Sequence, residues 1–343
     1  MHMADALLSP AVGGGMYAVS VAAVAYSAKK IKKDDLGESK APLMAVSGAM
    51  VFAAQMINFT IPGTGSSGHI GGGILLAVLL GPYAGTLALS AVLVIQCLCF
   101  ADGGLLALGC NIFNMAVIPC LFIYPLIMKR ILSRSPNAKR IWIGSIVSVI
   151  IALQLGAFFV VLETTVSGVA ELPFTAFVLL MQPIHLAIGA VEGVVTAAIL
   201  NFVFAARPQI LTTNLSAAGS EYPKSGKTAG IKNIIIVFAC IAAALAAGFS
   251  LLASKYPDGL EWAVQRAIGT AQPNTGGEPA GFFASIQQHL AFMPGYDTSS
   301  GTGAGTPIAG LIGAVLVFAL AGAAALIILA YKKKRKNAVK PNP

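Results

Sequence analysis

The sequence predicts an all-α membrane protein, in which a bundle of seven helices with an extracytoplasmic N-terminus is followed by a smaller part with two transmembrane helices. The first observation is composition: hydrophobic residues make up 57% of the 343 residues and charged residues only 10%, whereas roughly a quarter of the residues in a globular protein are charged. The mean hydropathy is +0.81. The other two observations are the length of the apolar runs and the clustering of basic residues at their ends.

Each expected membrane helix corresponds to an apolar run that approaches or exceeds the ~20 residues needed to cross a bilayer. Backbone groups in lipid must find their hydrogen bonds within the segment, so we expect each run to be helical. The expected helices are 10–28, 43–60, 84–100, 105–128, 141–162, 174–204, 231–253 and 307–331.

Basic clusters at 29–40, 129–140 and 332–336 predict cytoplasmic segments, because Lys and Arg accumulate on the inner side of a membrane. The net charge of +9 therefore reflects topology and does not indicate a nucleic-acid partner. The N-terminus and the loop 61–73 are then extracytoplasmic. An odd number of crossings must separate this loop from 129–140, so residues 70–82 are expected to supply a third, short helix that is buried in protein.

Composition also divides the chain. We expect a membrane domain over 1–206, a cytoplasmic linker rich in Pro, Gly, Ser, Thr and Lys over 207–230, and an accessory part over 231–343. The accessory part has two predicted helices, a long outer loop between them and a cytoplasmic C-terminus. No basic and apolar signal segment with a cleavage site precedes the first helix, so Met1 is expected to be the mature terminus.

The first chemical signal is the N-terminal sequence Met1-His2-Met3. The free α-amine of Met1, the amide nitrogen of His2 and the His2 imidazole can close adjoining rings around one cation. Nitrogen donors that include a deprotonated amide suit planar Ni(II) or Cu(II), whereas Mg(II) and Ca(II) prefer oxygen. An ordinary start codon followed by a chance histidine is the alternative interpretation.

The second signal is the glycine-rich loop 61–73, which contains His69. The loop lacks the lysine of a phosphate-binding loop, so nucleotide binding is a poor interpretation. Glycines allow the loop to fold back into the bundle, and the predicted topology puts it on the same side as Met1. We therefore expect His69 to complete a four-nitrogen set with the N-terminal donors. Considered alone, a histidine such as His69 is more often structural, and it is the combination with His2 on the same face that favours the metal.

Ionisable groups inside an apolar helix are costly and indicate function or mutual pairing. His185 and Glu192, seven residues apart, lie on one face of the helix 174–204. A structural hydrogen-bonded pair between helices is the alternative. Asp102 is interpreted as part of a turn and His289 as an ordinary loop residue. The five cysteines are expected to pack in or beside helices without a disulfide framework.

Four ordered motifs carry a resemblance to the NikM/CbiM family, the substrate-capture subunits of nickel and cobalt energy-coupling-factor (ECF) transporters. They are Met1 to Asp5, Gly63 to His69, Asp102 to Gly109 with Asn111 to Met115, and His185 to Gly193. The segment Pro257-Asp258-Gly259-Leu260-Glu261 resembles the P-D-G-L-E signature of the accessory NikN/CbiN subunit. The chain is thus similar to a fused protein, with the first family over 1–206 and the second over 231–343.

The resemblance implies an importer of Ni(II) or Co(II) that holds the metal with Met1, His2 and His69. Asp5, Ser67, His185 and Glu192 are candidates for a supporting or structural role. It also implies a prokaryotic cytoplasmic membrane, a NikQ/CbiQ-like coupling subunit and NikO/CbiO-like ATPases. The chain has no Walker A motif of its own, and no bound cofactor is expected.

Two other classes of protein are weighed against this one. A metal-coupled secondary transporter would work without partners, but such proteins usually show internal symmetry and paired broken helices. An intramembrane metalloenzyme would need an open metal position and a base; H-E-x-x-H is absent, and His185 with Glu192 is its only support. For the metal, amide ligation favours nickel over cobalt. The pair Gly189 and Gly193 could pack against the coupling subunit or inside the bundle.

Overall fold

The computed structural model describes residues 2–31, 40–133, 136–215, 230–270, 278–297 and 305–338. Most of them are helical. The helices of the first part are η1 (Asp5–Leu7), α1 (Pro10–Lys30), α2 (Lys40–Gln55), α3 (Gly73–Leu80), α4 (Pro82–Phe100), α5 (Leu108–Ile112), η3 (Phe113–Met128), α6 (Lys129–Ser133), α7 (Ala138–Ser167), α8 (Phe174–Ala206) and α9 (Gln209–Leu215). The second part contains α10 (Ile231–Ala247), η4 (Phe249–Leu252), α11 (Gly259–Ile268), α12 (Glu278–Leu290), η5 (Pro294–Tyr296) and α13 (Gly305–Ala338).

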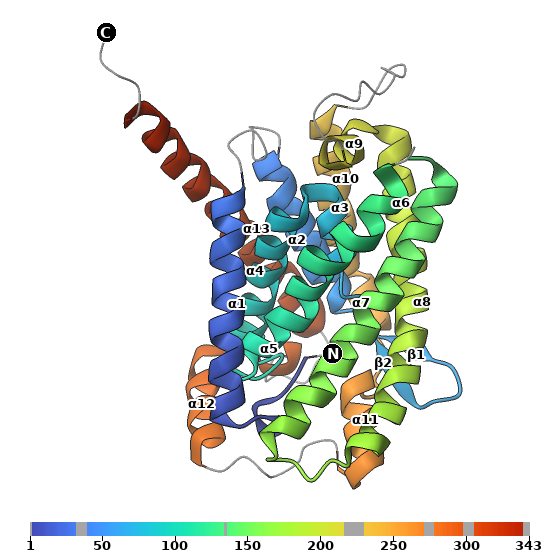
Figure 1. Cartoon of the computed structure of the whole chain (residues 1–343), viewed down its shortest axis with the longest axis vertical. Helices are drawn as coiled ribbons and strands as arrows, with labels where there is room; N and C mark the ends of the chain where they lie inside the picture. The colour runs from blue at the N-terminus through green and yellow to red at the C-terminus, as the bar shows by residue number, and fades with distance from the viewer. Residues whose placement is uncertain are drawn as a thin grey trace.

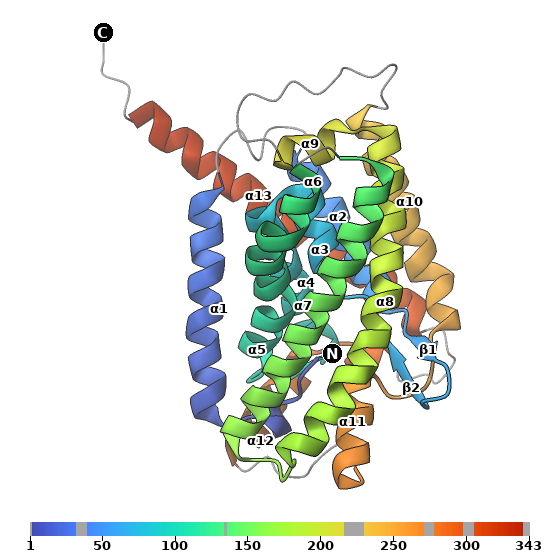
Figure 2. The same cartoon turned by 45° about the vertical axis from the view of Figure 1, so that its right-hand side comes forward.

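Length and composition identify membrane-spanning helices directly. Among the described residues, six helices are long and apolar enough to cross a bilayer: α1, α4, the continuous helix 108–133, α7, α8 and α13. α10 is apolar but shorter. The chain is therefore a multi-pass membrane protein. Both views show α1 on the flank of the bundle, and only 17% of its apolar stretch is buried, so most of its surface is left for lipid or a partner (Figures 1 and 2).

The helices run roughly along one axis, and the two ends of the bundle differ in chemistry. One end carries α6, α9 and the basic C-terminal turns of α13, and α1 finishes there with Lys29 and Lys30 (Figure 1). The opposite end carries α11, α12 and a small β-hairpin (Figure 1). The described members of the basic clusters used to predict topology thus gather at one end of the molecule.

The hairpin is a departure from the all-α prediction. α2 ends at Gln55, so the expected helix 43–60 is too long, and residues Phe59–Ile61 (β1) pair antiparallel with Ser66–Gly68 (β2). Two long-range backbone bonds support this geometry: the Ser67 amide donates to Pro257 O (2.8 Å) and the Ser254 amide to Asn58 O (2.7 Å). Because those partners lie almost two hundred residues away in the chain, a local pattern does not reveal the hairpin.

The expected short element at 70–82 is present as α3, and every one of its residues is buried. It lies between Gly72 and Gly81, both with positive φ, which turn the chain sharply at each end. The expected helix 105–128 begins instead at Leu108 and continues to Ser133. Its middle section, η3, winds in wide turns around Pro119 and Pro125, whose missing amides interrupt the normal ladder.

The second part packs into the core of the first. α10 and α13 both contact α2, and α13 also contacts α4. Phe238 and Val317 belong to the same buried apolar cluster as Phe52 and Val78. Elsewhere, Gly189 and Gly193 of α8 lie against the backbone of Ile150 and Ile146 in α7. Those two glycines therefore serve packing inside the bundle, which decides between the two roles left open by the sequence.

Candidate metal site

The N-terminal segment is held deep in the protein before α1 begins. The Met3 amide donates to Asn111 Oδ1 (2.8 Å), Met3 O accepts from the Gly104 amide (2.8 Å), and the Met3 side chain is fully buried. Asp5 Oδ1 accepts from the Ala107 amide (3.0 Å). Asp5 thus fastens the segment to the turn before α5. These bonds position His2, whose side chain is only 6% exposed.

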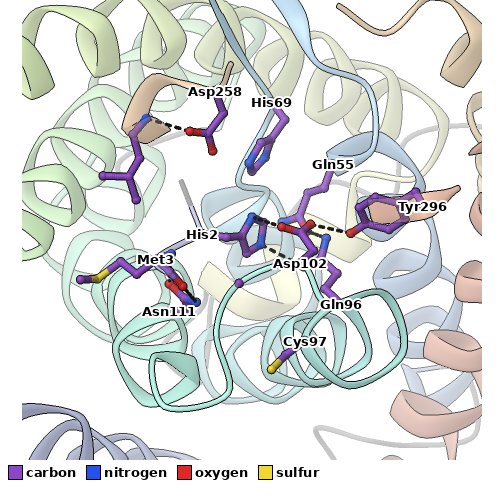
Figure 3. A network of polar contacts seen from close by, with 12 residues as sticks. His2, Met3, Gln55, His69, Gln96, Cys97, Asp102, Asn111, Asp258 and Tyr296 are labelled. Carbon is purple, nitrogen blue, oxygen red and sulfur yellow. Dashed lines mark hydrogen bonds and ion pairs between the residues drawn. The ribbon is translucent and has the colours of Figure 1, made fainter. Parts of the chain in front are cut away.

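His2 contacts two polar side chains (Figure 3). Its Nε2 lies 3.1 Å from Gln96 Oε1 and its Nδ1 lies 3.3 Å from Asp102 Oδ1. Gln96 Nε2 donates to Gln55 Oε1 (2.8 Å), and Gln55 Nε2 donates to Gly71 O (2.8 Å). With Nε2–H of His2 as the first donor, every link of this relay has matched polarity. The relay favours the tautomer with the proton on Nε2, whereas the Asp102 carboxylate, which also only accepts, favours a proton on Nδ1. The two contacts therefore compete for the single proton of a neutral His2.

His69 lies beside His2. Their ring centroids are 5.1 Å apart with an interplanar angle of 21°. His69 Nδ1 lies 3.0 Å from Ile70 O; a carbonyl oxygen only accepts, so Nδ1 carries the proton and Nε2 has the lone pair. Burial lowers the pKa of both histidines below its ordinary value. Two neutral imidazoles therefore lie side by side in the protein interior, in the protonation state in which imidazole binds a metal ion.

α8 fixes the loop that carries His69. The Glu192 carboxylate accepts hydrogen bonds from the amides of Gly71 (2.7 Å) and Gly72 (2.9 Å). A Cβ at Gly68 would lie 2.5 Å from Ile188 Cγ1, so only glycine permits this close approach. The structural alternative drawn from the sequence was a hydrogen-bonded pair of His185 and Glu192. Glu192 does not bond to His185. It anchors the glycine-rich loop instead.

The P-D-G-L-E segment has a structural explanation. Asp258 Oδ1 accepts from the amides of Leu260 (2.8 Å) and Glu261 (2.9 Å), and Glu261 Oε2 accepts from the Asp258 amide (3.3 Å), which is a capping box at the start of α11. A Cβ at Gly259 would lie 3.3 Å from His185 Cε1, and the Leu260 side chain is 2% exposed. The signature thus starts a helix that packs tightly on α8.

The same segment docks on the His69 loop. Ser67 Oγ donates to Tyr256 O (2.8 Å), and Trp262 Nε1 donates to Thr64 O (3.0 Å). Ser67 therefore holds the accessory part. Together with the N-terminal segment and α12, the P-D-G-L-E segment lines a partly open hollow of about 700 Å³, whose lining residues include Asp102 and Glu261.

Sequence reasoning missed several residues of this arrangement. Gln55 and Gln96 are polar side chains buried within apolar helices, 4% and 0% exposed, and that feature could have identified them. Asp102 is more than a turn residue, because it contacts His2 and accepts a hydrogen bond from Tyr296 Oη. The contact with Tyr296 has no local sequence signal, since the two residues are separated by most of the chain.

The remaining predicted site residues are placed as follows. Met1 lies outside the described residues. His185 is buried in α8, 1% exposed, and His289 is exposed on α12, as expected for a residue without a special role. Across the ranges that the structure describes, no three His, Cys, Asp or Glu side chains gather as a metal cluster. The two imidazoles therefore need further donors of another kind to hold an ion.

The fold and the paired histidines define a class: a helical membrane protein with nitrogen donors suited to a transition metal. Comparison with known proteins gives the family. The profile for CbiM, the cobalt uptake substrate-specific transmembrane region, matches residues 2–210, and that for the PDGLE domain matches residues 232–330. The chain belongs to the CbiM family and carries a PDGLE domain.

Individual relatives agree with this family. A putative fused nickel transport protein NikMN of Archaeoglobus fulgidus is 33% identical over 93% of this chain and 96% of its own length. A fused nickel transport protein NikMN of Rhodobacter capsulatus is 32% identical over 64% of this chain and 67% of its own. The crystal structure of a truncated transition metal transporter aligns with a TM-score of 0.53 at 30% identity, covering 60% of this chain and 99% of that one.

Proposed function

We propose that this chain is the substrate-capture subunit of an ECF-type transporter that imports Ni(II) or Co(II). The observation that carries the proposal is the stacked pair formed by His2 at the start of the chain and His69 in the glycine-rich loop, whose buried rings have centroids 5.1 Å apart. The relatives are nickel and cobalt transport proteins by name, which supports a metal ion as cargo.

The proposed ligands are the Met1 amine, the His2 amide nitrogen, the His2 Nδ1 and the His69 Nε2. Ring closure from the amide through the His2 side chain reaches Nδ1, and metal binding at Nδ1 requires the proton on Nε2, which is the tautomer that the Gln96 relay favours. Asp102 Oδ1 lies 3.3 Å from this same nitrogen. Binding of the metal to Nδ1 would therefore replace the contact between His2 and Asp102. Four nitrogen donors that include an amide stabilise planar Ni(II) most and Co(II) less. They bind Zn(II) poorly, because Zn(II) prefers a tetrahedral site.

The proposed topology places the N-terminus, the β-hairpin, α11 and α12 outside the cytoplasmic membrane, and the basic end inside. Seven helices then form the capture domain over 1–206, with α3 as the short buried member. The linker over 207–230, which begins with the helix α9, leads to the accessory part. The docking of that part on the His69 loop supports a role in shaping metal access. ATP hydrolysis and the transport cycle are assigned to separate coupling and ATPase subunits.

The N-terminal amine provides the sharpest test. Adding one or two residues before Met1 moves the amine away from His2, so high-affinity Ni(II) binding should be lost while the helical circular dichroism is retained. Calorimetry on the purified protein measures the affinity. In the unextended protein, the first equivalent of Ni(II) should give a yellow, diamagnetic, planar complex. Unchanged affinity in the extended protein, or a tighter Zn(II) complex, contradicts the amide-ligation proposal.

A further inference from the structure

A small internal cavity lies next to the proposed site. It has a volume of about 40 Å³, and its lining includes His69, Asn114, Met115, His185, Glu192 and Asp258. A buried water needs about 10–15 Å³ of such volume, so the cavity has room for a few water-sized groups. The cavity extends from the His69 loop into the space between η3, α7 and α8, which is the interior of the bundle.

His185 lines the cavity and has one ring nitrogen without a hydrogen-bond partner among the described residues. Its Nδ1 lies 2.8 Å from Met181 O, one helical turn back, so Nδ1 carries the proton and Nε2 has the lone pair. Among the described residues Nε2 has no hydrogen-bond partner, although the side chain is only 1% exposed. An imidazole held by a backbone carbonyl with its other nitrogen available is the usual arrangement of a metal ligand.

A second unpaired donor lies on the same cavity. Asn114 Nδ2 donates to Glu163 Oε2 (2.8 Å), while Asn114 Oδ1 has no partner in the described part of the chain. Asn114 and the thioether of Met115 come from the wide-turn helix η3, a geometry often found at functional sites. By contrast, the two carboxylate oxygens of Glu192 already accept from the Gly71 and Gly72 amides, so Glu192 supplies negative charge but remains an anchor.

We propose that this cavity is a second cation station, in which His185 Nε2 and Asn114 Oδ1 bind the divalent metal on the inner side of His69. The inference rests on the proposed function, since it assumes Ni(II) or Co(II) as cargo at the outer site. The inner station offers an imidazole, an amide oxygen and water without an amide nitrogen or an amine. It therefore binds more weakly than the outer site, as is required of a station that the cargo must leave.

His289 offers a matched control for His185. Its Nδ1 also bonds to the carbonyl one turn back, Ser285 O at 2.7 Å, but its ring is exposed on α12 and is absent from the lining of the cavity. Full-length protein is titrated with NiCl2 or CoCl2 alone, and bound metal is counted after equilibrium dialysis. We expect one tight and one weaker equivalent. His185→Ala should weaken only the weaker equivalent, by about tenfold or more, and His289→Ala should change neither.

Three results would overturn the inference. The unmodified protein could bind no second, weaker equivalent of metal, the weaker equivalent could persist in His185→Ala, or it could weaken as much in His289→Ala as in His185→Ala. A variant His2→Ala/His69→Ala separates the two proposals, since it should lose the tight equivalent and keep the weaker one. If the unmodified protein bound no tight equivalent of metal, that result would instead contradict the proposed function. If His185→Ala fails to fold, Asn114→Ala in the double-variant background provides the second test, and an unchanged weaker equivalent there overturns the inference.

Discussion

The loop 59–73 and the helix α12 each carry a histidine whose Nδ1 bonds to a backbone carbonyl. The local bond is the same, but the surroundings differ. His69 is 8% exposed and stacks on His2, whereas His289 is exposed to the outside. The hydrogen bond at Nδ1 therefore does not distinguish His69 from His289. What makes a histidine a candidate ligand is the environment of its Nε2.

The surroundings of His69 come from three other segments of the chain. Glu192 in α8 holds the backbone of the loop, Pro257 of the accessory part pairs with Ser67, and Gln55 in α2 donates to Gly71 O. The position of His69 is therefore a property of the assembled bundle. This predicts a graded series of losses as ligands, relay and anchor are removed in turn.

The largest effect is expected for His69→Ala, which removes one of four proposed donors. Ni(II) affinity should fall by more than the factor of about 100 that marks the upper range for losing a supporting contact. His289→Ala should leave affinity unchanged. Calorimetry on both variants makes the comparison direct, and equal losses would move the site to the region around α12.

The pH dependence sharpens the ligand assignment. Burial lowers the pKa of His2 and His69, so both are already neutral at neutral pH and release no proton on binding. The amine, with an ordinary pKa of about 7.7–8.0, and the amide each release one proton. Below about pH 7.5 the affinity should then fall about 100-fold for each unit that the pH falls, since two protons compete. A slope of one proton, measured by chelator competition, would remove the amide from the ligand set.

The chemistry of the histidines and the pattern of basic residues were enough to predict part of the site and part of the fold from the sequence. The residues His2 and His69 were predicted to meet, and the structure brings their rings together. The short buried helix at 70–82 followed from counting basic loops. The hairpin at 59–68 and the role of Glu192 could not be predicted, because each depends on partners more than a hundred residues away. Asp258 belonged to a recognised motif, yet only the structure shows that it caps α11.

Gln96 tests whether the relay matters. Gln96→Leu removes the acceptor for His2 Nε2–H and leaves Gln55 without its donor, so His2 is free to adopt the other tautomer. A loss of supporting contact typically costs about 10–100-fold in metal affinity. Gln182→Leu is the matched control, because Gln182 bonds to the backbone of Gln154 and not to the histidines. If both variants bind Ni(II) normally, the relay does not orient His2.

The smallest effect is expected at Glu192, which touches the backbone of the loop and neither histidine. Glu192→Gln keeps one oxygen acceptor for the amides of Gly71 and Gly72 but replaces the other by an NH2 group that cannot accept. One charge-assisted bond of about 1.5–3 kcal/mol is lost. The loop should open more often, which lowers affinity by about tenfold or less and speeds amide hydrogen exchange at Gly71 and Gly72. Faster exchange with unchanged affinity would show that the anchor stabilises the fold alone, whereas a loss as large as that of His69→Ala would make Glu192 part of the binding machinery.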